Sequence, residues 1–171
     1  MSNKSLIMKR NSVREFTTEV VNEDMIKALL QSGMQAPSAK NQQAWDFIVV
    51  DDRELLDRLS TMHVGSWPLQ TATLAIIPML RPTEKAPWMI QQDFGAVTQN
   101  ILLEATNLGL GAVWIGVYPL EERLKHVTDI FDIKGDNKPF CIIAIGHPSK
   151  TKEVTVRYDE SRVYRNKWTN K

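Results

Sequence analysis

Two arginines and a serine near the start of the chain are spaced to hold an anion. Arg10, Ser12 and Arg14 alternate within residues 9–16. In an extended segment their side chains share one face while Val13 points to the other. At a helix end the i,i+4 spacing also brings the two guanidiniums together. Because like charges repel, the pair indicates an anion between them. Guanidinium forks beside a hydroxyl suit the oxygen-rich surface of a phosphate.

The same segment allows a plainer interpretation. Glu15 and Glu19 follow closely enough to form surface ion pairs with the two arginines, which would leave no anion site. The segment alone does not choose between a phosphate site and surface ion pairs.

A second polar stretch covers residues 36–45, and its proline and short polar side chains favour a loop. Its hydroxyl and amide groups suit hydrogen bonding to an uncharged heterocycle or a sugar-like chain better than salt bridging. The alternative is an ordinary connection between a helix and a strand.

A third stretch, residues 108–117, contains three glycines. Gly109 and Gly111 end a long helix, and a strand then runs to Gly116. A glycine in that strand would let a flat ring approach the backbone closely.

Hydrophobic periodicity predicts the elements that position these stretches. We expect helices over residues 22–34, 52–60, 87–108 and 119–130, and strands over 46–50, 74–80, 140–145 and up to Gly116. This order favours an α+β sandwich, in which helices flank a central sheet.

The helix over residues 87–108 is apolar around most of its circumference, so it must be covered on several sides. It runs either through the centre of the subunit or against a partner chain. The tail, residues 149–171, is basic and aromatic without a helical or strand period. Its apolar side chains, Tyr158 and Trp168 among them, need a surface, so we expect the tail to wrap over the body or over a partner.

Composition narrows the function classes. A chain of 171 residues fits one domain, residues 1–171, and a net charge of +1 disfavours general nucleic-acid binding. Cys141 is the single cysteine and lies in an apolar run, as expected for a buried thiol in a reducing compartment. No signal peptide or membrane-spanning run is recognisable, so we expect a cytoplasmic protein without membrane contact. No metal-ligand cluster or nucleotide-binding glycine motif is present.

Four stretches, taken in order, resemble the nitroreductase family of FMN-dependent oxidoreductases. They are the opening motif Arg10 to Phe16, the loop Ala36 to Trp45, the run Asp93 to Gly116, and the turn Gly146-His147-Pro148 with its basic tail. The loop is similar to the family pattern Pro-Ser-x-x-Asn-x-Gln-Pro-Trp, with Ala44 in place of the second proline. The turn has His147 where the family usually has tyrosine, and we assign no chemistry to that histidine.

The resemblance implies a nitroreductase-like sandwich, with a mostly antiparallel sheet, that forms an interlocked homodimer around bound FMN. The implied cofactor residues are Arg10, Asn11, Ser12, Arg14, Pro37, Ser38, Asn41, Gln43, Trp114, Ile115, Gly116 and Arg157. The arginines and Ser12 would hold the phosphate, and Lys152 is the alternative to Arg157. The loop would reach the flavin from the second subunit. The backbone near Gly116 would face the flavin N5 and O4 edge, and Lys40 is a candidate for its pyrimidine edge.

The implied reaction is a two-step exchange on the cofactor, with no catalytic side chain and no metal. NADH or NADPH gives hydride to FMN, and a small oxidised acceptor such as a nitroaromatic or a quinone then takes it at the same place. Two alternatives remain: a non-catalytic FMN-binding or storage protein, and a specialised relative such as a dehalogenase. The latter would need extra lid residues, and the span from Ser60 to Pro87 leaves little room for them.

Overall fold

The structure is a computed structural model that describes residues 5–150 and 153–168. Its helices are α1 (Leu6–Lys9), α2 (Glu23–Met34), α3 (Arg53–Ser60), α4 (Ile90–Asn107) and α5 (Glu121–Phe131). Its strands are β1 (Trp45–Val50), β2 (Leu74–Leu80), β3 (Gly111–Gly116), β4 (Lys138–Pro139) and β5 (Cys141–Gly146). Short 3-10 turns are η1 (Ala39–Asn41), η2 (Val64–Gln70), η3 (Pro87–Met89) and η4 (Glu160–Arg162).

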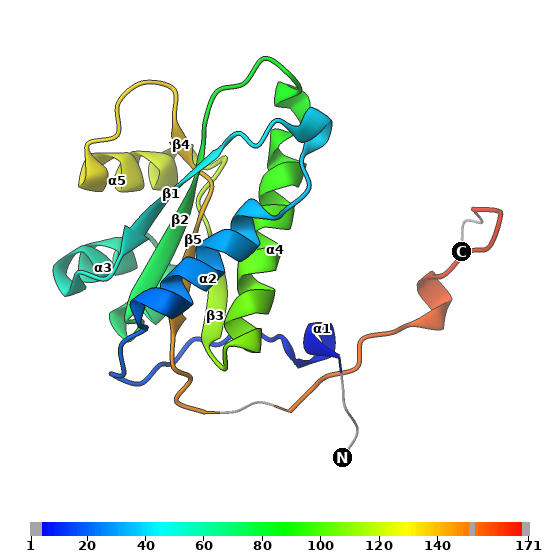
Figure 1. Cartoon of the computed structure of the whole chain (residues 1–171), viewed down its shortest axis with the longest axis horizontal. Helices are drawn as coiled ribbons and strands as arrows, with labels where there is room; N and C mark the ends of the chain where they lie inside the picture. The colour runs from blue at the N-terminus through cyan, green and yellow to red at the C-terminus, as the bar shows by residue number, and fades with distance from the viewer. Residues whose placement is uncertain (1–4, 151–152, 169–171) are drawn as a thin grey trace.

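The strands form one sheet in the order β1-β2-β5-β3, with β4 also paired to β2. Every pairing between named strands is antiparallel, as expected. Helices α2 and α4 cover one face, and α3 and α5 cover the other (Figure 1). Successive residues of β2 alternate between the two cores: Ile76 joins the α2/α4 side and Ile77 the α3/α5 side. The predicted α+β sandwich is therefore confirmed.

Helix α4 is covered largely within its own chain. It packs against the sheet on one side and α2 on another, where Asn100 Nδ2 donates to Ser32 O at 3.0 Å and Ser32 Oγ donates to Asn100 O at 3.2 Å. Leu102, on its broad apolar face, is only 5% exposed. The apolar circumference therefore fits a helix inside the subunit and does not by itself require a partner. The helix also begins later than expected, because Pro87–Met89 forms the 3-10 turn η3.

The tail leaves the body of the chain. Residues 153–158 run beside α1, and the described remainder extends away from the sheet and helices (Figure 1). Tyr158 is 75% exposed, while Tyr164 and Trp168 pack on each other with ring centroids 4.5 Å apart. The described tail beyond residue 158 therefore does not wrap over its own body, and wrapping over a partner stays a prediction. In the described residues, no helix combines the length and apolarity needed to cross a membrane.

Candidate functional site

An extended N-terminal arm, residues 10–17, lies along the end of the sheet. Val13 N donates to Ala112 O at 3.0 Å, and Thr17 N donates to His147 O at 2.8 Å. A Cβ atom on Gly111 would lie 2.6 Å from Val13 Cγ1, so the arm can dock only where the sheet carries glycine. The sequence pattern identified this glycine as part of a helix end and a strand. Its role in seating the arm depends on a contact between distant segments.

The arginines of the arm have no acidic partner among the described residues. Glu15 instead pairs with Lys150 at 3.4 Å, and Glu19 pairs with His147 at 3.5 Å. The surface ion pairs that the sequence allowed for Arg10 and Arg14 are therefore not those that form. Both guanidiniums remain available for an anion from outside the chain.

Arg10 borders a cleft between the arm and the tail, which we call the arm–tail cleft. Its volume is about 330 Å³, and Asn11, Gln99 and Arg157 line it with Arg10. Asn11 Oδ1 is buried without a hydrogen-bond partner, whereas its Nδ2 donates to Lys9 O at 3.3 Å. The cleft therefore combines two guanidiniums and an unused acceptor with one carboxylate, that of Glu153, which forms no ion pair with either arginine among the described residues. Gln99 was missed as a site residue, although it stands in the Asp93 to Gly116 stretch.

Arg14 borders a second cleft of about 250 Å³, together with Trp67, Ser149 and Lys150. Its Nη1 donates to the carbonyl oxygen of Ser12 at 3.5 Å. Arg10 and Arg14 thus border different clefts, with half-buried Ser12 between them in the chain, and the expectation that they flank a single anion stays a prediction. Lys152, the alternative to Arg157, lies outside the described residues.

The polar loop around η1 is fixed by two buried side chains, Gln42 and Asp93, each 7% exposed. Gln42 Nε2 donates to Asp93 Oδ2, and Ala39 N donates to Asp93 Oδ1 at 2.9 Å. Gln43 N donates to Ser38 Oγ at 3.0 Å. The residues that match the family pattern are therefore different from the residues that hold the loop in place. Pro37, Asn41 and Gln43 are exposed and Ser38 is half-buried, while Gln42 holds the loop to α4.

This loop has a strained backbone. Lys40, Asn41 and Gln43 have φ values of 51°, 48° and 45°, in the left-handed region that favours glycine. Asparagine tolerates this region, but lysine and glutamine adopt it at a cost. The hydrogen bonds of Gln42 and Asp93 over-determine the loop, and such strain is concentrated at binding sites.

The loop and the arm–tail cleft do not converge within one chain. The loop is bonded to Asp93 in the first turn of α4, while Gln99 is six residues further on. This spacing places Gln99 about 9 Å along the helix and about 120° around it. Figure 1 shows η1 and α1 near opposite ends of α4.

The predicted ring-contacting backbone lies on β3. Gly116 has no side chain, and a Cβ built there would make an ordinary van der Waals contact with Arg123 Nη1 at 3.8 Å. Arg123 Nη1 donates to the Gly116 carbonyl at 2.8 Å and so fixes the strand end. Ile115 is buried and Trp114 is partly exposed against Phe140, with ring centroids 5.7 Å apart. This strand end can therefore accept a flat group close to its backbone.

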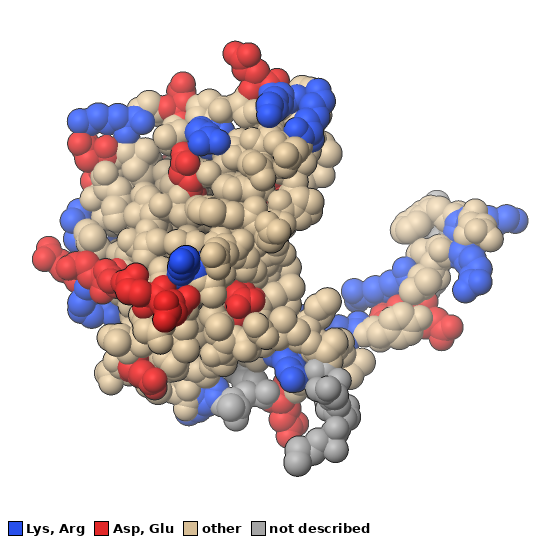
Figure 2. Space-filling model, in the orientation of Figure 1, with Lys and Arg blue, Asp and Glu red and all other residues tan. Residues whose placement is uncertain are grey.

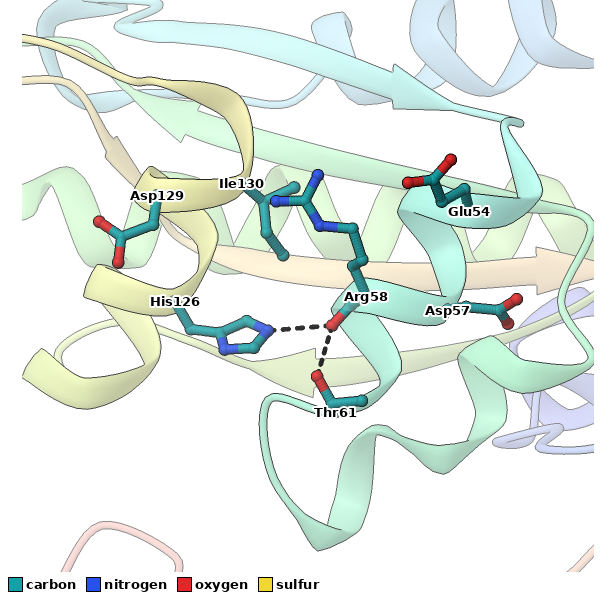
Figure 3. A pocket seen from close by; sticks show the side chains of 7 residues that line it. All are labelled: Glu54, Asp57, Arg58, Thr61, His126, Asp129 and Ile130. Carbon is teal, nitrogen blue, oxygen red and sulfur yellow. Dashed lines mark hydrogen bonds between the residues drawn. The ribbon is translucent and has the colours of Figure 1, made fainter.

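A further cleft lies between α3 and α5, and none of the predicted cofactor residues lines it (Figure 3). It has a volume of about 490 Å³. The carbonyl of Arg58 accepts from His126 Nε2 at 3.0 Å and from Thr61 Oγ1 at 2.8 Å. Asp57 pairs with Arg53 and Asp129 pairs with Lys125. Because these polar groups already have partners in the chain, the cleft is a helix junction, consistent with the structural role expected for His126.

The other histidine of interest, His63, is also engaged locally. Its Nδ1 accepts from Gly65 N at 2.9 Å, and burial, followed by the positive charge of Arg123, lowers its pKa. No group of three or more potential metal-ligating side chains occurs among residues 5–150 and 153–168.

Comparison with known proteins gives concordant matches. The nitroreductase family model matches residues 7–78 and 68–147. A relative in Archaeoglobus fulgidus, provisionally named an NADH dehydrogenase/NAD(P)H nitroreductase, is 38% identical over 168 residues, which cover 95% of this chain and 97% of that protein. A crystal structure from Clostridium acetobutylicum, provisionally described as an NADH oxidase, has a TM-score of 0.91 and 42% identity and covers 96% of this chain and 100% of its own. An FMN-dependent nitroreductase from Clostridium difficile has a TM-score of 0.88 and 28% identity over 95% of this chain and 98% of its own. The chain belongs to the nitroreductase family.

Proposed function

We propose that the protein binds FMN and carries hydride from NADH or NADPH to a small oxidised acceptor, such as a nitroaromatic or a quinone. The arm–tail cleft carries this proposal, because it brings together Arg10, Asn11 and Arg157 without an acidic partner for either guanidinium within the described chain. The FMN-dependent nitroreductase from Clostridium difficile supports the choice of cofactor.

The residues present fit the phosphate end of FMN. Arg10 and Arg157 would donate charge-assisted hydrogen bonds to phosphate oxygens. The orphaned Oδ1 of Asn11 can accept a hydrogen bond, which suits a hydroxyl of the ribityl chain. Ser12 and Arg14 follow along the arm and would hold the oxygens that adjoin the phosphate.

We further propose that the site is completed by a second copy of the chain. Ser38, Asn41 and Gln43 would reach the flavin from the partner, since within one chain none of them lines the arm–tail cleft. The outward side of α4 suits such an interface because the helix carries only two charged residues, Asp93, which is buried, and Glu104. Charge is depleted at the centres of interfaces. Figure 2 shows a largely uncharged surface over α4 between charged ends.

When bound, FMN supplies the redox chemistry, accepting hydride from the nicotinamide and passing it to the acceptor in a second step. The side chains and backbone of the protein would bind the cofactor and orient its ring. The arm would hold the phosphate end, and Gly116, which has no side chain, would allow close approach of the ring. Residues 61–86 contain η2, β2 and a connecting loop but no separate lid helix. This simple enclosure favours plain reduction over the dehalogenase-like alternative.

The test is spectroscopic. The purified protein should be yellow, and anaerobic NADH or NADPH should bleach the flavin stoichiometrically until a quinone or nitroarene restores it. Bound flavin that stays oxidised under both nicotinamides would favour the storage alternative. A colourless protein that cannot be reconstituted with FMN would refute the proposal as a whole.

A further inference from the structure

We propose that Trp88 and Lys40 form an acceptor-selecting wall of the flavin site and favour flat aromatic acceptors that carry a negative charge. This inference rests on the proposed function and on the loop around η1 contacting the flavin. It assigns the two side chains a role toward the acceptor, distinct from holding the cofactor.

The two side chains form a pair on the surface. Trp88 lies in η3, and 71% of this large aromatic residue is exposed to solvent. Lys40 Nζ lies over its indole, 5.5 Å from the ring centroid. A cation over one part of an exposed aromatic surface makes a cation–π contact and keeps the ammonium beside the ring. A single exposed tryptophan is common on protein surfaces. A tryptophan with a lysine ammonium beside it offers a ligand both a stacking surface and a positive charge.

The pair is fixed to the loop that carries Ser38 and Asn41. Ala86, two residues before Trp88, exchanges two hydrogen bonds with Gln42: Gln42 Nε2 donates to Ala86 O at 3.2 Å, and Ala86 N donates to Gln42 Oε1 at 3.1 Å. The same Gln42 side chain is bound to Asp93. The loop, η3 and the start of α4 therefore move as one unit, so a flavin contacted by this loop has Trp88 and Lys40 beside it.

The chemistry of the pair indicates the kind of acceptor. An aromatic acceptor can stack offset on the indole, an arrangement that stabilises the contact beyond the burial of apolar area. The Lys40 ammonium forms no ion pair within the described residues, so a carboxylate on the acceptor can meet it. Neutral acceptors would gain only the stacking contact. Selectivity for anionic over neutral nitroaromatics is therefore assigned to Lys40, and selectivity for flat rings to Trp88.

Three variants test the inference in the FMN-loaded protein: Trp88→Leu, Lys40→Gln, and Lys85→Gln as a charge control from the exposed segment that precedes η3. The acceptors are 4-nitrobenzoate and 4-nitrobenzyl alcohol, which differ mainly in charge. Trp88→Leu should raise KM for both by about five- to tenfold, the loss expected of a stacking contact. Lys40→Gln should raise KM for 4-nitrobenzoate alone by about three- to fivefold, as for an exposed ion pair. Lys85→Gln should change neither.

A readout independent of turnover separates this inference from the function on which it rests. Calorimetric binding of 4-nitrobenzoate to the oxidised protein should weaken by the same factors, while FMN occupancy stays unchanged and excess nicotinamide still bleaches the flavin completely. If the unmodified protein fails to bleach, the proposed function itself is wrong.

Three results would overturn the inference while leaving the function in place. One is an unchanged KM in both site variants. Another is a Trp88→Leu protein that elutes as a monomer with unaltered selectivity, because Trp88 would then be an interface residue. The last is a Lys40→Gln protein in which flavin reduction slows but acceptor selectivity stays the same, since Lys40 would then act on the flavin.

Discussion

Arg10 and Asn11 line the same cleft, and a guanidinium beside an amide oxygen that lacks a partner is complementary to a phosphate joined to a hydroxyl-bearing chain. A guanidinium gains more from a charged, bidentate phosphate than from an uncharged chain end. The positive charge and the position of these groups should therefore favour binding of phosphorylated over unphosphorylated flavin.

Replacing Arg10 with alanine should weaken FMN binding by about tenfold to a hundredfold while changing riboflavin binding little, because a charge-assisted hydrogen bond contributes about 1.5–3 kcal/mol. Flavin fluorescence titrations measure both affinities. Arg58→Ala, in the junction between α3 and α5, is the matched control and should leave both unchanged. Equal losses for FMN and riboflavin would mean that Arg10 does not meet the phosphate.

Cys141 should resist alkylation in the folded protein. Burial raises its pKa to about 12, with a smaller opposing effect from its hydrogen bond with Thr98. At pH 8 only about one thiol in ten thousand would then be ionised, compared with about a quarter of an unfolded cysteine. A thiol-reactive dye should therefore label the protein only after denaturant is added. Rapid labelling of the native protein would contradict the burial.

The same pKa sets the direction of a stability change. An unfolded thiol ionises near pH 8.5, so above that pH the folded state, with a pKa of about 12, binds more protons than the unfolded state. The free energy of unfolding should therefore fall as pH rises above about 8.5. A Cys141→Ala protein lacks this contribution and serves as the reference in urea titrations at pH 7 and pH 10.

At the scale of elements, the arm depends on glycines that are distant in the sequence. A Cβ on Gly111 would clash with Val13 at 2.6 Å, whereas a Cβ on Gly146 would lie 3.1 Å from Phe16. The first distance requires the arm to shift, and the second requires adjustment by only a few tenths of an ångström. The seating of the arm is therefore more sensitive at Gly111.

Gly111→Ala should lower the free energy of unfolding by about 1–3 kcal/mol, as overpacking does, and should weaken FMN binding because the arm is displaced. Gly146→Ala should change the free energy of unfolding and FMN binding in the same direction, by smaller amounts. Urea titration and FMN titration of both variants measure the two effects. The reverse order, or a Gly111→Ala protein that keeps full FMN affinity, would show that the arm does not position the phosphate site.

The main helices and strands could be predicted because each has a strong local signal. The apolar run Leu74–Leu80 coincides with β2, and the periodic segment after Pro87 contains α4. Helix α1 was not predicted, since its four residues include none that is buried. The sheet order and the anchoring of η1 were equally out of reach. Gln42 and Asp93 are 51 positions apart, and nothing in either local pattern specifies their hydrogen bond.

For the candidate site, the types of the binding residues were predictable but their grouping was not. Spacing placed Arg10 with Arg14, while the fold places Arg10 with Arg157 and Arg14 with Lys150. Extended backbone brings side chains to one face, but residues of the tail line the cleft at Arg10 and Trp67 of η2 lines the cleft at Arg14. Such divisions depend on distant segments.

At the scale of the whole molecule, the two groups of proposed cofactor residues do not meet within one chain, so we expect the binding unit to be a homodimer with two sites. Arg10→Ala and Asn41→Ala chains should each lose FMN binding when alone. Mixed under conditions of subunit exchange, they should form heterodimers in which one site carries neither change. About a quarter of all sites should then recover, the fraction expected for random pairing of two chains.

Bound FMN and fluorescence-tagged subunit exchange measure this recovery together. Demonstrated exchange without recovered sites would exclude a site shared between chains, as would a stable monomer at full FMN occupancy. Dilution offers a second readout, because flavin should be released as the dimer dissociates, and added FMN should restore the dimer by linkage.

The arm also closes an open boundary of the sheet. At one boundary, β1, Asp46 pairs with Arg81 at 3.4 Å and places charge along the strand. At the other, β3, the first residues are covered by the arm through the bridge between Ser12 and Ala112. Unpaired strand edges invite pairing with other molecules, and natural sheets block them with charge or cover. A chain that lost its first 17 residues would therefore lose more than cofactor contacts: its exposed β3 edge would favour insoluble self-assembly, visible as light scattering that grows with concentration.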